Sequence, residues 1–549
     1  MHEAIRVATS KSRSPRDVVQ AIQALEDRAD FCFDGLELLD RNAWNVGMWA
    51  GLVQAAAHVE GAIPHHAYGG KTHQIVLTNL SRIMPIMCDW CRRHGEQRTA
   101  PVSRFQWTRA RAIATSTAFE AAAHYMPFCA TFPAWHRDLV AAEMFEPAGV
   151  TFIALDNLEE RRVSAYRKGM GPGNAPVPPV ERPPDLENLI REVLGTVQQR
   201  GLEIHYPRPE RLLRSLNEAY QSRLAAAFRR YEGISVGDYS LQEFRTVYAA
   251  LTAVAAAREH ICFRSAQING RYPLESAVFH YAREQWIEQL SEMSGVGRAT
   301  TEAIINDMTF GATRLLDMIV HPFVPLDDCG RRLGLVPHFV LASNAEENIL
   351  RICSYVRPRF YNAASAQKEV EMREELNSCA SPFHLGGPVR LRRDLPDIDL
   401  VVEDTKTSTV AICELKWGRK PYSVAETVLR DQELTHGAEQ LEMVQRFLRD
   451  NPDFLRLRRV LSRSLNEYRR IEYLLVARDH MKWIAPVEQR SIVGFNPFKS
   501  VLERADFSAG VDRLLSYDWL PVEGKDFRVE FKDDTVNGVT MRSESFFPM

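Results

Sequence analysis

The chain has 549 residues, of which 45% are hydrophobic and 25% charged, and its formal net charge is −3 at pH 7. This composition is that of a globular protein, and the length exceeds what one hydrophobic core organises, so two or three domains are expected. The near-neutral charge argues against a protein that coats nucleic acid with its whole surface, although it allows a local basic groove.

The N-terminal region, residues 1–168, is predicted to be a mainly helical domain. Apolar residues recur there at helical spacing over four stretches, residues 14–25, 48–57, 75–90 and 112–125. A short apolar run over residues 150–155 predicts one strand.

The sequence predicts neither export nor membrane insertion. Its first residues lack the apolar run of a signal peptide, and no stretch reaches the roughly eighteen apolar residues of a membrane-spanning helix. The nine cysteines are scattered, which is typical of a reducing compartment. A cytoplasmic protein without a membrane partner is therefore expected.

A stretch rich in glycine and proline, residues 169–185, cannot hold a helix or a central strand and is predicted to be a linker or long loop. Residues 186–345 follow as a second helical domain. Its predicted helices cover residues 186–199, 211–231, 241–262 and 274–293.

The turn at residues 293–300 stands apart because Gly295 and Gly297 join two predicted helices. It resembles a helix-hairpin-helix motif. The resemblance implies that backbone N–H groups of the turn contact a nucleic-acid phosphate and that Arg298 adds a charge-assisted contact. The alternative is a plain glycine turn that ends one helix before the next begins.

The C-terminal region, residues 346–549, contains two apolar segments that read as strands, residues 396–402 and 409–416, on either side of a polar turn. Alternate side chains of a strand share a face. Glu414 and Lys416 therefore point the same way.

Asp397 and Asp399 likewise share a face of the first strand, and the register of the hairpin decides which of them meets Glu414. A turn centred between residues 406 and 407 places Asp399 opposite Glu414, whereas a two-residue shift places Asp397 there. In both registers the carboxylates converge and repel each other unless a cation lies between them. Mg²⁺ is the expected cation, because it prefers one or two carboxylates together with water and phosphate oxygens.

These residues resemble the signature of the PD-(D/E)xK nuclease superfamily, with Pro396-Asp397 as the PD and Glu414-Leu415-Lys416 as the ExK. The superfamily's metal-binding aspartate often opens a strand of the form Ile-Asp-Leu-Val, which matches Asp399 better than Asp397, and both are retained. The resemblance implies that Mg²⁺ or Mn²⁺ is held by these carboxylates and that Lys416 acts on the scissile phosphate.

The segments on either side of the hairpin resemble the order of helices and strands in the same superfamily. Residues 366–376 are predicted to form an amphipathic helix on which Glu369 resembles a further acidic ligand. A helix over residues 435–448 carries Gln440, which is similar to the glutamine that orients the lysine in several branches of the superfamily. With a strand over residues 471–477, the region is expected to form a restriction-endonuclease-like αβββαβ core.

Two groups of arginines flank this core. Arg390 and Arg392 precede the aspartates and are expected to share a strand face, and a second group includes Arg456 and Arg459. Guanidinium groups bind phosphates without reading sequence. The alternative is a solvated helix face whose arginines pair with acids.

The sequence thus predicts a multidomain α and α/β protein, with a largely helical N-terminal region before a Mg²⁺-dependent nuclease domain. DNA is favoured over RNA as substrate, and by analogy the protein is expected to act in phage defence or DNA repair. The sequence leaves a homo-oligomer or a separate partner subunit open. The competing hypothesis is a catalytically silent nucleic-acid-binding or scaffold protein that keeps the nuclease fold.

Overall fold

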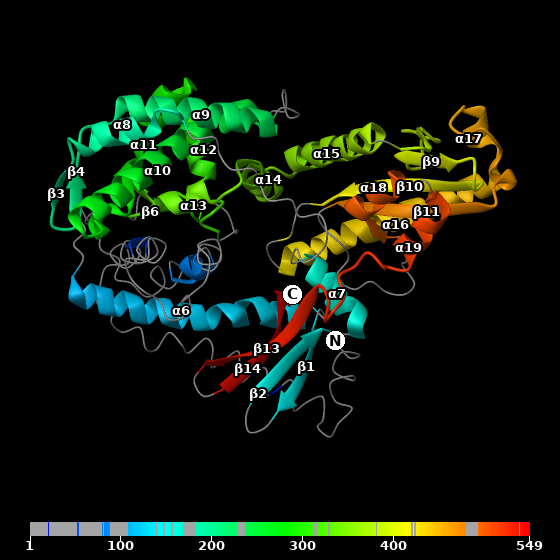
Figure 1. The fold of residues 1–549 in the computed structure, drawn as a ribbon, viewed down its shortest axis with the longest axis horizontal. Helices are drawn as coiled ribbons and strands as arrows, with labels where there is room; N and C mark the ends of the chain where they lie inside the picture. The colour runs from blue at the N-terminus through cyan, green and yellow to red at the C-terminus, as the bar shows by residue number, and fades with distance from the viewer. Residues whose placement is uncertain are drawn as a thin grey trace. The chain divides into compact units, whose positions relative to one another are not determined.

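The computed structural model describes most of the chain from residue 108 onward (Figure 1). The described residues are 20, 23, 52–53, 80, 82–87, 108–137, 140–145, 149–154, 157–167, 183–228, 236–311, 317–327, 330–379, 381–418, 421, 424–478, 492–504, 506–536 and 539–549. Most of the predicted helices at 14–25, 48–57 and 75–90 and of the predicted linker at 169–185 therefore lies outside the described residues.

The chain divides into two compact units, each built from separate parts of the sequence. The first unit comprises residues 1–27, 128–177 and 365–549, and the second comprises residues 28–127 and 178–364. This division differs from the predicted consecutive domains 1–168, 186–345 and 346–549, although one boundary falls inside the predicted linker. The structure is a mixture of helices and sheets, as the sequence predicts for a multidomain α/β protein.

The first unit contains a five-stranded sheet in the order β12-β11-β10-β9-β8 (Figure 1). The strands are β8 (His384–Gly386), β9 (Leu400–Asp404), β10 (Thr409–Trp417), β11 (Arg470–Arg478) and β12 (Ile492–Gly494). The pairs β8–β9 and β9–β10 are antiparallel, and the pairs β10–β11 and β11–β12 are parallel. The hairpin strands are apolar and buried along almost their whole length, as expected for the centre of a sheet.

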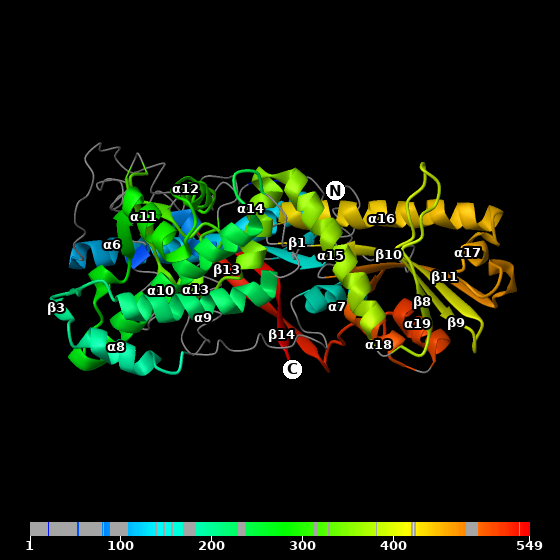
Figure 2. The ribbon, with the colours of Figure 1, turned by 90° about the horizontal axis from the view of Figure 1, so that it is seen from above.

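Two long helices accompany this sheet. Helix α15 (Pro358–Ser378) precedes β8, and α16 (Val424–Asp450) forms the crossover between the parallel strands β10 and β11. Figure 2 shows α16 running along the sheet beside those strands. Its apolar residues Val444 and Phe447 pack with Ile412 of β10 in one buried cluster, which fixes the helix on the sheet.

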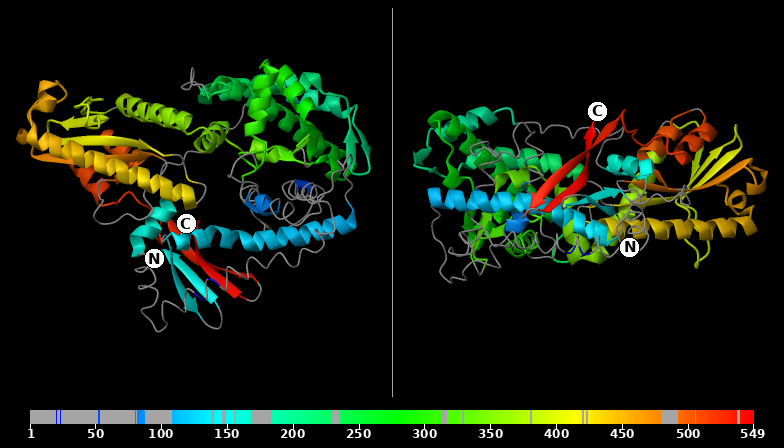
Figure 3. Two further views of the ribbon diagram at one scale, coloured as in Figure 1. Left: turned by 180° about the vertical axis from the view of Figure 1, so that it is seen from behind. Right: turned by 90° about the horizontal axis from the view of Figure 1, so that it is seen from below.

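A second sheet in the same unit explains why the unit is discontinuous. Its order is β1-β2-β14-β13, with strands β1 (Val140–Phe145), β2 (Gly149–Ala154), β13 (Phe527–Val536) and β14 (Val539–Pro548). The strand predicted at residues 150–155 is confirmed as β2, and it pairs in parallel with β14 of the C-terminal hairpin (Figure 3). The unit also contains α7 (Asn157–Arg167), α17 (Phe454–Leu457), α18 (Phe495–Leu502) and α19 (Phe507–Leu515).

The second unit is mainly helical and is organised around α10 (Leu241–Asn269), most of whose residues are buried. This helix starts at a capping box formed by Ser240 and Glu243. The other helices are α8 (Leu186–Leu194), α9 (Glu210–Phe228), α11 (Arg283–Ser294), α12 (Arg298–Asp307), α13 (Pro337–Leu341) and α14 (Ala345–Val356), and α6 (Arg109–His136) contributes residues to both units.

The helix predicted over residues 274–293 is shorter in the structure. Residues of its first half form β5 (Phe279–Ala282), which pairs with β7 (Arg332–Leu335) in a three-stranded sheet completed by β6 (Val324–Pro325). A second small sheet pairs β3 (Gln198–Arg200) with β4 (Glu203–His205). Pairing with a distant strand overrides the local helical pattern in residues 279–282.

Candidate active site

The β9–β10 hairpin has the first of the two predicted registers. Asp404 lies opposite Thr409, and Leu400 lies opposite Cys413, so the turn is centred between residues 406 and 407. Asp399 and Glu414 are the next residues along the two strands, and the backbone N–H of Leu415 donates a hydrogen bond of 2.8 Å to Asp399 Oδ2. Asp399, rather than Asp397, therefore lies beside Glu414.

Glu414 and Lys416 share a face of β10, as the strand periodicity predicts. Lys416 Nζ lies 2.7 Å from Glu414 Oε1, and the two side chains are 21% and 7% exposed. Burial lowers the pKa of Lys416, but Glu414, Glu369 and Asp399 together hold it above the ordinary value. Lys416 is therefore a charged ammonium group surrounded by carboxyl groups.

Glu369 of α15 reaches the same end of the sheet. Its Oε1 accepts a hydrogen bond of 3.4 Å from the backbone N–H of Trp417, the last residue of β10. Arg373, one helical turn further along α15, lowers the pKa of Asp399 by its charge. Arg373 is a site residue that the sequence prediction missed, although its i+4 spacing from Glu369 was a signal.

The three carboxyl groups are in an environment that disfavours their negative charge. Burial, followed by the charge of Asp399, raises the pKa of Glu414 to about 7. Burial, partly offset by Lys416, raises the pKa of Glu369 to about 7. Burial also raises the pKa of Asp399 despite the hydrogen bond from Leu415. One ammonium group thus serves three carboxyl groups, and a bound divalent cation would favour their charged forms.

Asp397 is placed differently. It is exposed, and its Oδ1 accepts a hydrogen bond of 3.3 Å from the backbone N–H of Leu391. Its effect on the site is electrostatic, because its charge raises the pKa of Asp399. Asp399 is thus the better candidate metal ligand of the two.

Helix α16 touches the lysine through Gly437. A Cβ atom at this position would lie 3.0 Å from Lys416 Cε and 2.9 Å from Leu475 Cδ1, so only glycine lets the helix approach this closely. Gln440 lies three residues further on the same side of the helix. Its buried Oε1 has no hydrogen-bond partner among the described residues. This oxygen can therefore accept a hydrogen bond from a ligand or from a side chain that changes its conformation.

The ligands of a metal are not yet gathered in this arrangement. Among the described residues, no three side chains of histidine, cysteine, aspartate or glutamate are placed so that together they hold an ion. The oxygen donors of Asp399, Glu414 and Glu369 nevertheless have the chemistry that Mg²⁺ and Mn²⁺ prefer.

The turn at residues 293–300 joins α11 to α12, and its geometry is compatible with both the helix-hairpin-helix prediction and the plain glycine turn. Gly295 ends α11 with a left-handed φ of 72°, and Gly297 is the N-cap of α12. Open space surrounds the position of a Cβ at either glycine. Arg298 is exposed and lies 3.1 Å from Glu284, so its charge is partly neutralised.

The predicted phosphate-binding arginines fall into two kinds. Arg390 and Arg392 are exposed on either side of the buried Leu391, and the Arg392 guanidinium lies over the Phe447 ring. They precede β9 in an irregular segment instead of a regular strand.

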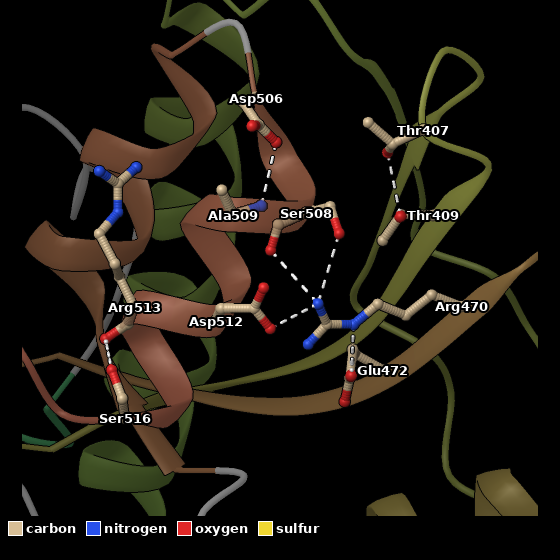
Figure 4. Close-up of polar contacts among 10 residues, drawn as sticks. All are labelled: Thr407, Thr409, Arg470, Glu472, Asp506, Ser508, Ala509, Asp512, Arg513 and Ser516. Carbon is tan, nitrogen blue, oxygen red and sulfur yellow. Dashed lines mark hydrogen bonds and ion pairs between the residues drawn. The ribbon is translucent and has the colours of Figure 1, made fainter.

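In the second group, which also includes Arg470, two arginines pair with acids. Arg456 pairs with Asp453 at 3.1 Å, and Arg459 is exposed with a left-handed backbone. Figure 4 shows Arg470 of the same group between Glu472 and Asp512, at 2.7 Å from each. For Arg456 and Arg470 this arrangement agrees with the alternative of a solvated, acid-paired surface.

No protein-family model matches the chain, no curated protein matches its sequence, and no solved structure matches its fold. Among the described helices, none has both the length and the apolar character needed to cross a membrane.

Proposed function

We propose that the protein is a metal-dependent nuclease that hydrolyses phosphodiester bonds, with DNA as the favoured substrate and its active site at the end of the β9–β10 hairpin. The observation that carries the proposal is the buried juxtaposition of Asp399, Glu414 and Lys416. Burying three such groups together destabilises a fold, and hydrolysis of a phosphate ester supplies a reason to keep them.

The order of elements supports the same proposal. Along the chain, α15, β8, β9, β10, α16 and β11 follow one another as helix, three strands, helix and strand. This is the αβββαβ order of the PD-(D/E)xK nucleases. Glu369 lies on the first helix, Glu414 on β10 and Gln440 on the second helix, while Asp399 directly precedes β9. This order supports the proposal.

In this proposal Asp399 and Glu414 hold Mg²⁺ or Mn²⁺, and Glu369 is a further ligand. The bound ion supplies an activated water and neutralises charge on the phosphodiester. Lys416, released from Glu414, donates a hydrogen bond to a phosphate oxygen or to the attacking water. Gln440 orients the Lys416 ammonium through its unpartnered Oε1.

The nucleic acid is held by groups outside the metal site. Arg390 and Arg392 are solvent-exposed within the segment that leads into Asp399, and this exposure supports a role in binding the backbone phosphates of DNA. The Gly295 to Gly297 turn offers a second contact through its open backbone.

One observation favours the competing function of a silent nucleic-acid-binding protein. The Glu414 and Lys416 side chains are paired with each other, which satisfies both without a metal or substrate. A protein that had lost cleavage could still keep both residues, because removing one of them would leave the other charge buried and unpaired.

The proposal is tested by incubating the full chain with single-stranded, duplex and branched DNA and with RNA, in the presence of Mg²⁺ or Mn²⁺. Wild type is compared with Glu414→Ala and Lys416→Ala. Lys532→Ala is a matched control, because Lys532 pairs with Asp534 two residues away on β13 in the same way. We expect cleavage that both site variants reduce by about 10² or more and that the control retains. Equal cleavage by all four proteins, or none by wild type, would contradict the proposal.

A further inference from the structure

The second unit contains a pocket of about 680 Å³ that is distant in sequence from the candidate active site. It is lined by residues of α10, α11, β5 and the segment after β4. Its volume lies within the range of about 300 to 1,000 Å³ typical of sites for small organic molecules. A single inorganic ion would fill only a fraction of it.

The pocket contains a buried cation, Arg258 of α10, which is 9% exposed. Its Nε and Nη2 donate hydrogen bonds to the Ser276 carbonyl oxygen at 3.0 and 2.8 Å, and its Nη1 donates to Tyr206 Oη at 2.9 Å. Its guanidinium also lies over the rings of Tyr206 and Phe279. These contacts position the group but leave its charge uncompensated.

Arg258 forms no ion pair with a carboxylate anywhere in the described part of the chain. A guanidinium has five N–H groups, so its three hydrogen bonds leave two available. A buried charge is normally paired, because removing it from water costs several kcal/mol. An anion in the pocket would supply the missing partner.

Two uncharged donors line the same pocket. The Tyr206 oxygen accepts from Arg258, and burial raises the pKa of Tyr206, so its hydroxyl keeps a proton to donate. Gln289 of α11 is 9% exposed, and its side chain makes no hydrogen bond to a described residue. The pocket therefore combines a cation with hydrogen-bond donors that await an acceptor.

The remaining charges of the lining are nearly balanced. Arg200, Arg208, Glu203 and Glu275 also line the pocket, and Arg208 pairs with Glu210 and Glu292 outside it. Glu203 lies 3.4 Å from His205. Arg258 is the buried cation of the lining and forms no ion pair with a described carboxylate, and the low local dielectric strengthens its effect on an anion.

Aromatic and apolar groups form the rest of the wall. Phe279 and Tyr281 of β5 lie edge to face, 4.7 Å between ring centroids, and Val254 and Leu213 line the pocket beside them. Such a wall accommodates a flat or apolar body attached to the anionic group. The dimensions and the wall together select an organic phosphate over inorganic phosphate alone.

We propose that this pocket binds a small phosphorylated molecule with a ring, of the nucleoside monophosphate class, and that Arg258, Tyr206 and Gln289 hold its phosphate. The proposal stands independently of the nuclease function, because all its residues lie in the second unit and binding requires no cleavage.

The test is calorimetric titration of the full chain with AMP, CMP, GMP and UMP, without divalent cations. Adenosine and inorganic phosphate are titrated separately, since each lacks one half of the proposed ligand. The variants are Tyr206→Phe, which removes only a hydroxyl, and Gln289→Glu, which places a carboxylate in the pocket. Arg264→Gln is the control, because Arg264 lies on the same helix but pairs with Glu187 outside the pocket.

We expect at least one monophosphate to bind with a Kd below about 1 mM, and adenosine and inorganic phosphate each to bind at least about 10-fold more weakly. Gln289→Glu should weaken binding by about 10-fold to 100-fold and Tyr206→Phe by a few-fold to 10-fold, while Arg264→Gln leaves it unchanged. The proposal is overturned if no monophosphate binds the folded wild type, if adenosine binds as well as AMP, or if Gln289→Glu binds as tightly as wild type. Circular dichroism of each variant establishes that it is folded.

Discussion

Lys416 Nζ lies 2.7 Å from Glu414 Oε1, two residues apart on one face of β10 and largely shielded from solvent. This ammonium group is shared with Asp399 and Glu369, whose charges also raise its pKa. The excess of carboxyl groups over cations is the physical basis for proposing a metal at this end of the sheet.

The pH dependence of stability should report the crowded carboxyl groups. Burial raises the pKa of Glu414 and of Glu369 from 4.5 to about 7, so the folded chain binds protons more tightly than the unfolded chain. Stability from this source is complete below about pH 4.5 and is lost as the pH rises through 7, by about 1 to 3 kcal/mol per group.

Urea denaturation between pH 5 and 8 in the presence of a chelator measures this loss. Glu414→Gln should flatten the profile, because the amide does not titrate. Glu375→Gln is the control. Lys499 and Arg478 hold the pKa of Glu375 below its ordinary value, so its contribution to stability is lost as the pH falls and not as it rises. A wild-type profile that rises steadily from pH 5 to 8 would disprove the assignment.

Gly437→Ala should impair the site without unfolding the protein. The new Cβ meets Leu475 Cδ1 at 2.9 Å and Lys416 Cε at 3.0 Å, so both flexible side-chain ends must shift, while the preference of alanine for the helix, about 1 kcal/mol, offsets part of the cost. We expect cleavage to fall by about 10²-fold with little change in the denaturation midpoint, because small misplacements of a catalytic group have large effects. His436→Ala, at an exposed neighbouring position, should cleave normally. Normal cleavage by Gly437→Ala would show that α16 does not position Lys416.

The register of the hairpin could be narrowed to two possibilities from the sequence. A shift by one residue would turn the apolar side chains of a strand to its other face, so only registers that differ by two residues were considered. The pairing of Asp404 with Thr409 selects one of them and thereby selects Asp399 over Asp397. Glu369 and Gln440 were located by resemblance. Arg373 and Gly437 were missed because their contribution depends on how α15 and α16 approach β10, which local sequence does not specify.

The larger organisation was less predictable for a similar reason. The parallel pairing of β2 with β14 joins residues that are almost 400 positions apart, as in Thr540 opposite Gly149, and no local pattern announces it. The C-terminal hairpin is local by contrast, since Val536 pairs with Val539. Residues 279–282 read as helix but form β5 because β7 is available to pair with them.

Two arginines should respond in opposite ways to replacement by alanine. Arg470→Ala removes contacts with Glu472 and Asp512 and should lower the free energy of unfolding by about 1 to 2 kcal/mol with unchanged DNA affinity. Arg390→Ala should leave stability unchanged but weaken DNA binding. The slope of the logarithm of the binding constant against the logarithm of the salt concentration should fall in magnitude by about one. Urea denaturation and fluorescence anisotropy at several salt concentrations measure both. If Arg470→Ala weakened DNA binding and Arg390→Ala lowered stability, Arg470 would be the DNA-binding residue and Arg390 the stabilising one.

The turn between α11 and α12 offers a matched pair of substitutions. Gly295→Ala strains a backbone with φ 72° and should destabilise the protein by about 1 kcal/mol. Gly297→Ala adds a methyl group in open space at an ordinary backbone angle, so it should introduce no backbone strain and should lower stability only through the poorer N-cap that alanine provides. If the turn contacts DNA phosphates, Gly297→Ala weakens DNA binding by hindering their approach. Unchanged affinity would identify the turn as a plain connection between helices.

The most direct measurement is a titration of Mn²⁺ into the full chain, followed by electron paramagnetic resonance, for wild type, Asp399→Asn, Glu414→Gln and the control Glu375→Gln. We predict that wild type and the control bind Mn²⁺ at a saturable site. Asp399→Asn and Glu414→Gln should lose this binding or bind Mn²⁺ at least about 10-fold more weakly. A wild type that binds no Mn²⁺, or site variants that bind it as tightly as wild type, would contradict a metal centre at the end of the hairpin.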